Sequence, residues 1–546
     1  ANKHLSILRG LKQQMSASRE KQNRQEQASS GWIDPKTARE AQQRKQEKRS
    51  NTLYGIIAVV FVLVAAAAIL YRSNIIPKMS TAATIDGEKY SAAEVSFYYQ
   101  NAYRSFLSNT SYFSYLGMDT STSLKDQTIS EDTVETITAL GLGEAEAGQT
   151  WYDFILNQAL TQMAQIQTAL NQAEEEGFTY PAGVQAQYDD SMSTLESAAQ
   201  ASGVSVNQYL TNVFGNNLIT ESVYGDQLMR MLQFDAYANA HAGSLSYDEA
   251  KLEETYAANP NDYDKVSYES VTISGTAPST TDEEGNTVEP TEEETAAAKE
   301  AAKSKADDML ASFRSGSELG ALAEAQDATY NENDRASYSA GSALSEWLFD
   351  DARTAGDSAV VESGSTYYVV VFHDRFREEY DSINVRHILV QPSTGTLSSE
   401  DEGYDEEQSQ LSADAKLKAE ELLEQWRSGE ATEESFATLA MQESTDGSKY
   451  DGGLYSRVCQ GDMVEAFNDW CFDPARQSGD TDIVETEYGY HVMYFVGYDL
   501  PAWQVAVTDT LKNEDYAAWE EGLAAESTIT RGDFGLKFVG DRKSVV

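Results

Sequence analysis

Asn384-Val-Arg-His-Ile-Leu-Val-Gln391 is an apolar stretch with a histidine at its centre, and it predicts a buried strand. A second histidine, His491, closes the sequence Tyr488-Gly-Tyr-His491 just before another apolar stretch. A buried imidazole loses free energy unless it has a polar partner. The chain has only five histidines, so we expect His387 and His491 to be partners. The plainer alternative, a core histidine satisfied in some other way, fits a single such residue better than two.

The residues between the two histidines contain a series of short motifs. A stripe of apolar residues at helical spacing predicts a helix that ends at Gly429: Ala415, Ala419, Leu422, Leu423 and Trp426. The motifs that follow are Ser444-Thr-Asp446, Asp451-Gly-Gly-Leu454, Gly461-Asp-Met463 with Phe467, and Val484 to His491. In this order they resemble the parvulin-type peptidyl-prolyl isomerase domain, over residues 382–500.

The resemblance implies a four-stranded antiparallel sheet with helices, and the isomerisation of prolyl peptide bonds. It implies catalytic roles for His387, Asp446 and His491. The residues that it places around the substrate are Leu454, Met463, Phe467, Thr486 and Tyr488. Tyr488 departs from the family, in which a serine or another hydroxyl residue is common here. Asp446 is equally readable as an ordinary turn carboxylate.

Other chemistries find no support in the motifs. The sequence has no Gly-x-Ser-x-Gly elbow, no His-Glu-x-x-His helix and no Walker loop. Its two cysteines, Cys459 and Cys471, are too few for a disulfide framework and lack metal-ligand spacing. A bridge between them stays open, although a buried Cys471 with Cys459 in a loop is the simpler interpretation. We therefore expect no cofactor and no metal.

Length and charge predict several domains and a membrane anchor. A chain of 546 residues is too long for one core. Residues 53–71 carry no charge, and such a run is long enough to cross a bilayer as a helix within 51–72. Residues 1–49 hold twelve Lys and Arg against five Asp and Glu. The positive-inside bias then places the tail, residues 1–50, in the cytoplasm and the bulk of the chain outside. A cleaved secretory signal is the alternative.

The strongly acidic remainder of the chain excludes one class of partner. The formal net charge is -49 in spite of the basic tail, which argues against nucleic acid. Acidic stretches at Thr280–Glu294 and Ser398–Glu407 are expected to be solvated loops. The second stretch would also repel a phosphorylated substrate.

Helical patterns dominate residues 82–264 after a short strand and turn at Thr84–Tyr90. Trp151–Glu176 carries apolar residues at helical spacing. Ser205 is expected to cap a helix, and Ser246-Tyr-Asp-Glu249 has the form of a capping box. The order of these features is similar to the N-terminal chaperone region of SurA- and PrsA-like foldases. Clefts rich in Tyr, Phe and Met would suit unfolded chains.

An internal repeat predicts a second domain of the same kind. Trp347-Leu-Phe-Asp-Asp-Ala-Arg353 matches Trp470-Cys-Phe-Asp-Pro-Ala-Arg476 without gaps. The expected first copy, residues 265–377, has Tyr268 in place of His387 and Tyr368 in place of His491. We interpret it as inactive, retained for packing or client binding. A helix at Trp503–Ser527 is expected in the C-terminal tail, residues 501–546.

Together these expectations describe an α+β protein: a single-pass, membrane-anchored, extracytoplasmic foldase, with unfolded secreted polypeptides and the bilayer as its partners. The rival from another class is a non-catalytic holdase or assembly scaffold that uses both parvulin-like domains for recognition. A weaker rival is an anchored sensor, suggested by the cytoplasmic tail.

Overall fold

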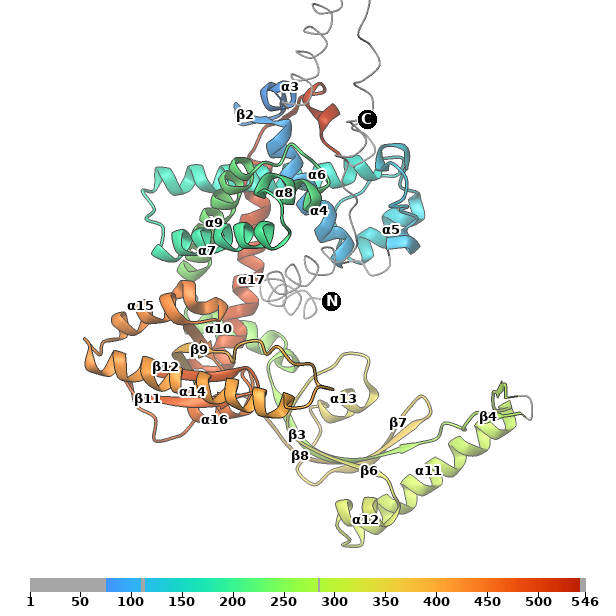
Figure 1. Ribbon diagram of the computed structural model, residues 1–546. Coiled ribbons are helices and arrows are strands. Elements are labelled where there is room, and N and C mark those ends of the chain that lie inside the picture. The colour runs from blue at the N-terminus through green and yellow to red at the C-terminus, as the bar shows by residue number, and fades with distance from the viewer. Residues whose placement is uncertain (1–74, 110–112, 283–284, 541–546) are drawn as a thin grey trace, which may run out of the picture. The chain divides into compact units, whose positions relative to one another are not determined.

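The computed structural model describes residues 75–109, 113–282 and 285–540, and their contacts divide the chain into two compact units (Figure 1). The expected membrane segment at 53–71 lies outside these ranges. None of the described helices has the length and apolarity needed to cross a bilayer. Both helices and sheets are present, in agreement with the α+β class. The expected domain boundaries remain predictions.

The first unit has a helical core, and its described residues are 75–109, 113–245, 434–453 and 512–540. Its helices are α3 Ile75–Met79, α4 Ala92–Asn109, α5 Glu131–Ala139, α6 Trp151–Glu175, α7 Ala182–Ala201, α8 Val206–Phe214 and α9 Glu221–Ser244, with α15 Glu433–Glu443 from later in the chain. Buried aromatic residues, among them Tyr98, Trp151 and Phe154, pack between α4 and α6. Ser205 caps α8 by accepting a hydrogen bond from the Gln208 N–H, as the sequence indicated.

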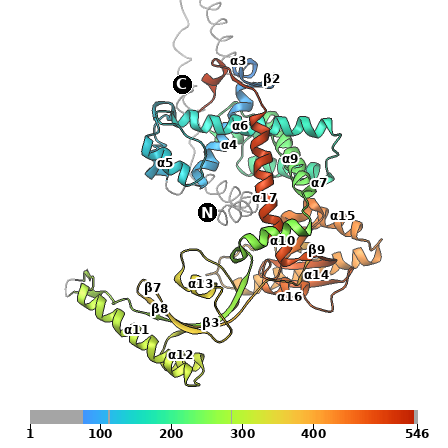
Figure 2. The same ribbon diagram turned by 180° about the vertical axis from the view of Figure 1, so that it is seen from behind.

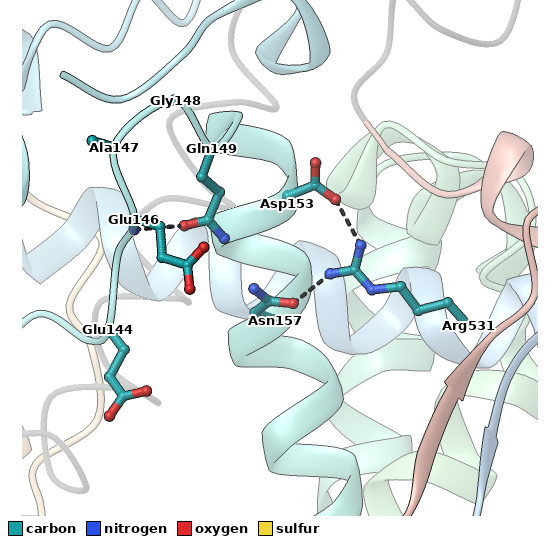
Figure 3. Close-up of a pocket in the computed structure, with 8 residues that line it drawn as sticks. All are labelled: Glu144, Glu146, Ala147, Gly148, Gln149, Asp153, Asn157 and Arg531. Carbon is teal, nitrogen blue, oxygen red and sulfur yellow. Dashed lines mark hydrogen bonds and ion pairs between the residues drawn. The ribbon is translucent and has the colours of Figure 1, made fainter.

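Residues near the C-terminus complete this unit with a strand, and no local sequence pattern indicated that strand. Strand β13 Ile529–Arg531 pairs with β1 Thr81–Ile85, which pairs in turn with β2 Glu88–Ser91. The helical region therefore also holds a small sheet. Arg531 is bonded to Asp153 and Asn157 at the side of an open, acidic pocket (Figure 3).

The second unit, residues 246–433 and 454–511, contains two four-stranded antiparallel sheets. The first sheet has the order β6-β3-β8-β7, with β3 Lys265–Ser274, β6 Thr329–Ser337, β7 Ser358–Ser363 and β8 Thr366–Phe376. One face packs against α11 Glu292–Arg314 and α12 Leu319–Ala325, and the other against α13 Ala343–Leu348 (Figure 2).

The second sheet has the equivalent order β10-β9-β12-β11. Its strands are β9 Asp381–Val390, β10 Leu454–Val458, β11 Thr481–Thr486 and β12 Gly489–Pro501. Helix α14 Tyr404–Ser428 contacts β9 and β12, and α16 Glu465–Cys471 packs on the face that carries Val385 and Phe495. Alternate residues of a strand point to opposite faces, so these two helices cover different sides.

The strand register corrects one expected equivalence between the two sheets. Phe372 accepts a backbone bond from Gly356 just as Phe495 does from Gly479, so β8 and β12 align as the repeat requires. Val370, two residues before Phe372, then corresponds to Met493. Met493 pairs with His387, but Val370 pairs with Ser270. The residue in the place of His387 is therefore Ser270 and not Tyr268. The sequence comparison was wrong by two residues because β3 and β9 share too few identities to fix their register.

Two helix boundaries and one loop also differ from expectation. Asp248, rather than Ser246, caps α10 Glu249–Ala258 by accepting from the Lys251 N–H. Helix α14 begins at Tyr404, so the acidic residues 405–407 lie in its first turn. There their negative charges interact favourably with the positive N-terminal end of the helix dipole. A short hairpin, β4 Thr280–Thr281 with β5 Thr287–Val288, interrupts the first acidic loop. Helix α17 Ala502–Ala525 matches the expected C-terminal helix.

Candidate active site

The two central strands of the second sheet place the histidines side by side. His387 on β9 pairs with Met493, and His491 on β12 pairs with Leu389, so the imidazoles are diagonal neighbours on the same face. Their Nδ1 atoms lie 3.0 Å apart. His387 is 2 % exposed and His491 5 %. The expected pairing of the two residues is thus present in the structure.

A hydroxyl extends this pair toward the end of the sheet. Thr486 is the last residue of β11, and its Oγ1 lies 2.8 Å from Nε2 of His491. The same oxygen accepts a hydrogen bond from the Tyr488 backbone N–H at 3.1 Å. Gly489, at φ +128°, closes the turn, and a Cβ there would lie 2.4 Å from the Val390 carbonyl oxygen. Only glycine therefore permits this close turn.

The short distance between the two imidazoles fixes the number of protons between them. If both Nδ1 atoms carried a proton, the N–H groups would collide, and if neither did, two lone pairs would face each other. One Nδ1 must donate and the other accept. The buried pair can thus be satisfied with both rings neutral, which avoids the cost of a buried charge.

Aromatic rings surround the histidines. Phe467 on α16 meets both imidazoles edge to face, at centroid distances of 5.5 Å to His387 and 5.4 Å to His491. Tyr455 on β10 stacks on His387 at 5.0 Å. Sequence reasoning missed Tyr455. It pairs with Val385, which shares a face with His387, so the signal was available only once the pairing of β10 with β9 was known.

The apolar residues expected to seat a proline lie at different places around this cluster. Met463 packs, partly buried, against the core that includes Phe467. Leu454 opens β10, half-buried, opposite Arg386. The Tyr488 side chain is 53 % exposed, and its hydrogen bond to Thr486 comes from the backbone. Phe467 and Met463 thus belong to one apolar cluster, whereas substrate binding by the Tyr488 side chain stays a prediction.

Asp446 is the N-cap of a short helix. It precedes the 3-10 helix η5 Gly447–Asp451 and caps it, since its Oδ1 accepts from the Ser448 N–H at 2.9 Å. This segment belongs to the first compact unit. The turn-carboxylate alternative therefore has direct support, and a catalytic role for Asp446 stays a prediction.

The described residues include no group of three or more His, Cys, Asp or Glu side chains able to hold a metal ion. Cys471 is buried on α16, Cys459 is half-buried in a loop, and both thiols are free. Burial raises the pKa of each thiol to about 12. Neither cysteine is a nucleophile at neutral pH, because the thiolate is the reactive form.

Comparison with known proteins places this geometry in a family. Residues 367–496 match the PPIC-type PPIase domain family, a stretch that contains both histidines, Thr486 and Phe467. No curated protein sequence matches the chain.

Several solved structures are similar over part of the chain. The peptidylprolyl isomerase PrsA of Bacillus anthracis is 23 % identical over 29 % of this chain and 60 % of its own, with a TM-score of 0.17. PrsA of Bacillus subtilis is 22 % identical over 27 % of this chain and 50 % of its own, with a TM-score of 0.19. A structure from a report on two SurA-like chaperones of Campylobacter jejuni, PEB4 and Cj1289, is 14 % identical over 73 % of this chain and 92 % of its own, with a TM-score of 0.12. The chain thus spans less than two thirds of the length of the two PrsA structures.

Proposed function

We propose that this chain, whose residues 367–496 form a parvulin-type peptidyl-prolyl isomerase domain, catalyses the cis-trans isomerisation of prolyl bonds in unfolded or partly folded polypeptides. The observation that carries the proposal is the chain of contacts His387–His491–Thr486 beside Phe467, in which the two histidines lie on the central strands of the matched domain.

The reaction needs a shaped site rather than covalent chemistry. Rotation about an X-Pro bond faces a barrier of about 18–20 kcal/mol because the amide is planar by resonance. A site lowers this barrier when it binds the twisted amide better than the planar one. Two features are required. The first is an apolar site without water that binds the pyrrolidine ring, which we call the seat and assign to Phe467, Met463 and Leu454. The second is a polar group that binds the rotating carbonyl. Phe467 and Met463 supply the first requirement, with Leu454 at the start of β10.

Thr486 is suited to the second requirement. When His387 donates through Nδ1 to His491, His491 carries its own proton on Nε2 and donates to Thr486 Oγ1. That oxygen then accepts two hydrogen bonds, one from His491 and one from the Tyr488 N–H. Both of its lone pairs are occupied, so the hydroxyl proton is directed outward. In this tautomer the histidine pair orients a donor for the carbonyl of the twisted prolyl bond.

The wider setting that we propose is a membrane-anchored foldase outside the cytoplasm. The uncharged run at 53–71 and the basic residues before it support an anchor with a cytoplasmic N-terminus. The exposed side chains of Tyr115 and Leu140 in the helical unit support the handling of unfolded secreted chains, since exposed apolar groups can contact apolar segments of a client.

A protease-coupled isomerisation assay on the full chain, with a proline tetrapeptide as substrate, tests the catalytic proposal. We expect acceleration over the uncatalysed rate, and its loss in a Met463→Ala/Phe467→Ala variant. Leu344→Ala is the matched control, because Leu344 occupies the position of Phe467 in the repeat and belongs to the first sheet. A wild-type rate equal to the uncatalysed one, or a double variant as active as the wild type, would reject the enzyme.

The first sheet favours a second, binding function beside catalysis. It presents Ser270 and Tyr368 where the second sheet has its histidines, so the imidazole pair is missing there. A holdase role predicts that His387→Ala still suppresses the aggregation of an unfolded client while isomerising nothing. Loss of both activities in that variant would speak against a separable holdase.

A further inference from the structure

An arginine of the first sheet contacts the isomerase domain next to its apolar seat. Arg335 lies on β6, an edge strand of the first sheet, and its guanidinium makes three hydrogen bonds. Nε donates to Glu378 Oε1 at 2.6 Å, Nη2 to the Tyr380 hydroxyl at 3.0 Å, and Nη1 to the Gln460 carbonyl oxygen at 2.9 Å. Glu378 and Tyr380 belong to the segment between the sheets, whereas Gln460 lies in the loop between β10 and α16.

Gln460 sits in the loop that leads into the seat, residues 459–463, which we name the pocket loop. The Tyr380 hydroxyl accepts from the Gln460 N–H at 3.0 Å, so the Gln460 peptide group is held at its nitrogen by Tyr380 and at its oxygen by Arg335. Within the loop, Asp462 Oδ2 accepts from the Cys459 N–H at 2.7 Å. The loop is thus fixed by its own turn and by the first sheet.

The pocket loop carries the residues that would meet a prolyl ring. Met463 is its last residue, and α16 with Phe467 begins two residues later. The Gly461 N–H donates to Asn468 Oδ1 at 2.8 Å, which ties the loop to that helix. A shift of the Gln460 peptide therefore moves Met463 and loosens the start of α16.

The strength of the contact depends on its charge. Hydrogen bonds from a guanidinium are roughly twice as strong as neutral ones, and the planar fork fixes the direction of each. Glu378 is largely buried, and its carboxylate neutralises the Arg335 charge. A lysine could keep the ion pair but could not reach all three acceptors at once.

We propose that Arg335 is a positioning residue of the isomerase site: the first sheet, which lacks the histidine pair, holds the pocket loop and thereby sets the affinity for the prolyl substrate. This rests on the proposed function. A loosened seat binds the pyrrolidine ring less tightly in the planar and the twisted states alike, and such uniform loss raises KM with little change in kcat.

Steady-state isomerase kinetics of full-length variants test the proposal, with the same proline tetrapeptide. We expect Arg335→Ala to raise KM about five- to tenfold with kcat within about twofold, and Arg335→Lys to give a smaller rise. Tyr380→Phe, which removes the other contact to Gln460, should also raise KM. Hydrogen exchange at the amides of 459–463 should accelerate in Arg335→Ala.

Arg375→Ala is the matched control. Arg375 lies on β8 of the same sheet and bonds Asp264, Asn261 and the Phe349 carbonyl, none of which is in the pocket loop. Its KM should equal that of the wild type. The proposal is overturned if the wild type is active and KM is unchanged in Arg335→Ala, or if Arg375→Ala raises KM equally. An inactive wild type would instead remove the proposed function on which this inference rests.

Discussion

The two four-stranded sheets share a framework but differ at the site. Trp470 lies under Arg476, which bridges Asp473 and Asp480 at 3.7 Å each. Trp347 lies under Arg353, which bridges Asp350 and Asp357, again at 3.7 Å each. The histidine pair and its aromatic ring have no such counterpart: the equivalent residues of the first sheet are Ser270, Tyr368 and Leu344.

The shared Trp–Arg–Asp contacts therefore belong to the fold, whereas the histidine pair, present in one sheet only, belongs to the proposed catalytic site. In both sheets the arginine, Arg353 or Arg476, holds the turn that precedes an outer strand. The imidazole pair has a packing cost, since two polar rings must satisfy each other inside an apolar face. A copy can replace them by Ser and Tyr and still form the same sheet. Variants at matched positions of the two sheets should therefore have different effects.

The largest contrast is expected in catalysis. His491→Ala removes the link between His387 and Thr486, and we expect kcat/KM to fall at least about tenfold, equivalent to ~1.4 kcal/mol of transition-state stabilisation. Tyr368→Ala alters the matched position of the first sheet, and kcat/KM should stay within about twofold, the range expected for an indirect effect. The protease-coupled assay measures both.

Thermal unfolding of both variants provides the control for this contrast, because His491→Ala also leaves His387 without its Nδ1 partner. The activity is compared at a temperature where both remain folded. Equal losses of activity in the two variants would contradict the assignment of the catalytic site to the second sheet alone.

The second contrast concerns η5, a turn that follows α15 and has no recognisable counterpart in the first copy. It packs against α7, where a Cβ on Gly183 would lie 1.9 Å from the Tyr450 carbonyl oxygen. Lys449 and Tyr450 both bond Asp190 on α7. Gly183→Ala must separate α7 from η5, and we expect hydrogen exchange at 447–453 to accelerate at least about tenfold, or ~1.4 kcal/mol.

Gly243→Ala is the control for the α7 contact. Gly243 lies on α9, and a Cβ added there would have no described atom within 4 Å. This variant should gain slightly in stability from the better helix propensity of alanine. Unchanged exchange at 447–453 in Gly183→Ala would mean that the contact contributes nothing to the order of the turn.

Part of the fold and of the site could be predicted from local sequence patterns, and part depends on which strands and loops come together in space. The His387 and His491 pairing followed from the cost of burying a lone imidazole, and Phe467 followed from the motif order. Tyr455 and the pocket-loop contact of Arg335 depend on which strands pair and which loops meet, and no local pattern encodes that. Ser270 shows the same limit, because a slip of two residues keeps the alternation of a strand intact.

A third contrast compares the two arginines in stability. Arg476 also donates through Nε to the Trp470 carbonyl at 3.0 Å, whereas Nε of Arg353 is buried without a partner. Arg476→Ala should therefore destabilise its sheet by about 2 kcal/mol and Arg353→Ala by about 1 kcal/mol. Hydrogen exchange of β12 and β8 amides in urea measures each sheet separately. A larger loss in the first sheet would contradict the assignment of the extra bond.

The fourth contrast is in pH dependence, at a core position where α16 carries Cys471 and α13 carries Leu348. Burial raises the pKa of the Cys471 thiol from 9.0 to about 12, so the folded state keeps the proton that the unfolded state releases. Stability from this residue is fully present below pH 9 and is lost as the pH rises from 9 toward 12, by about 1.4 kcal/mol at pH 10.

Cys471→Leu copies the residue of the first sheet and should remove this loss, while Leu348→Cys should introduce it there. Urea unfolding of the variants and the wild type at pH 8 and pH 10 isolates the effect, because the tyrosines titrate equally in all of them. An identical pH dependence with and without Cys471 would show that the thiol is not buried in the folded state.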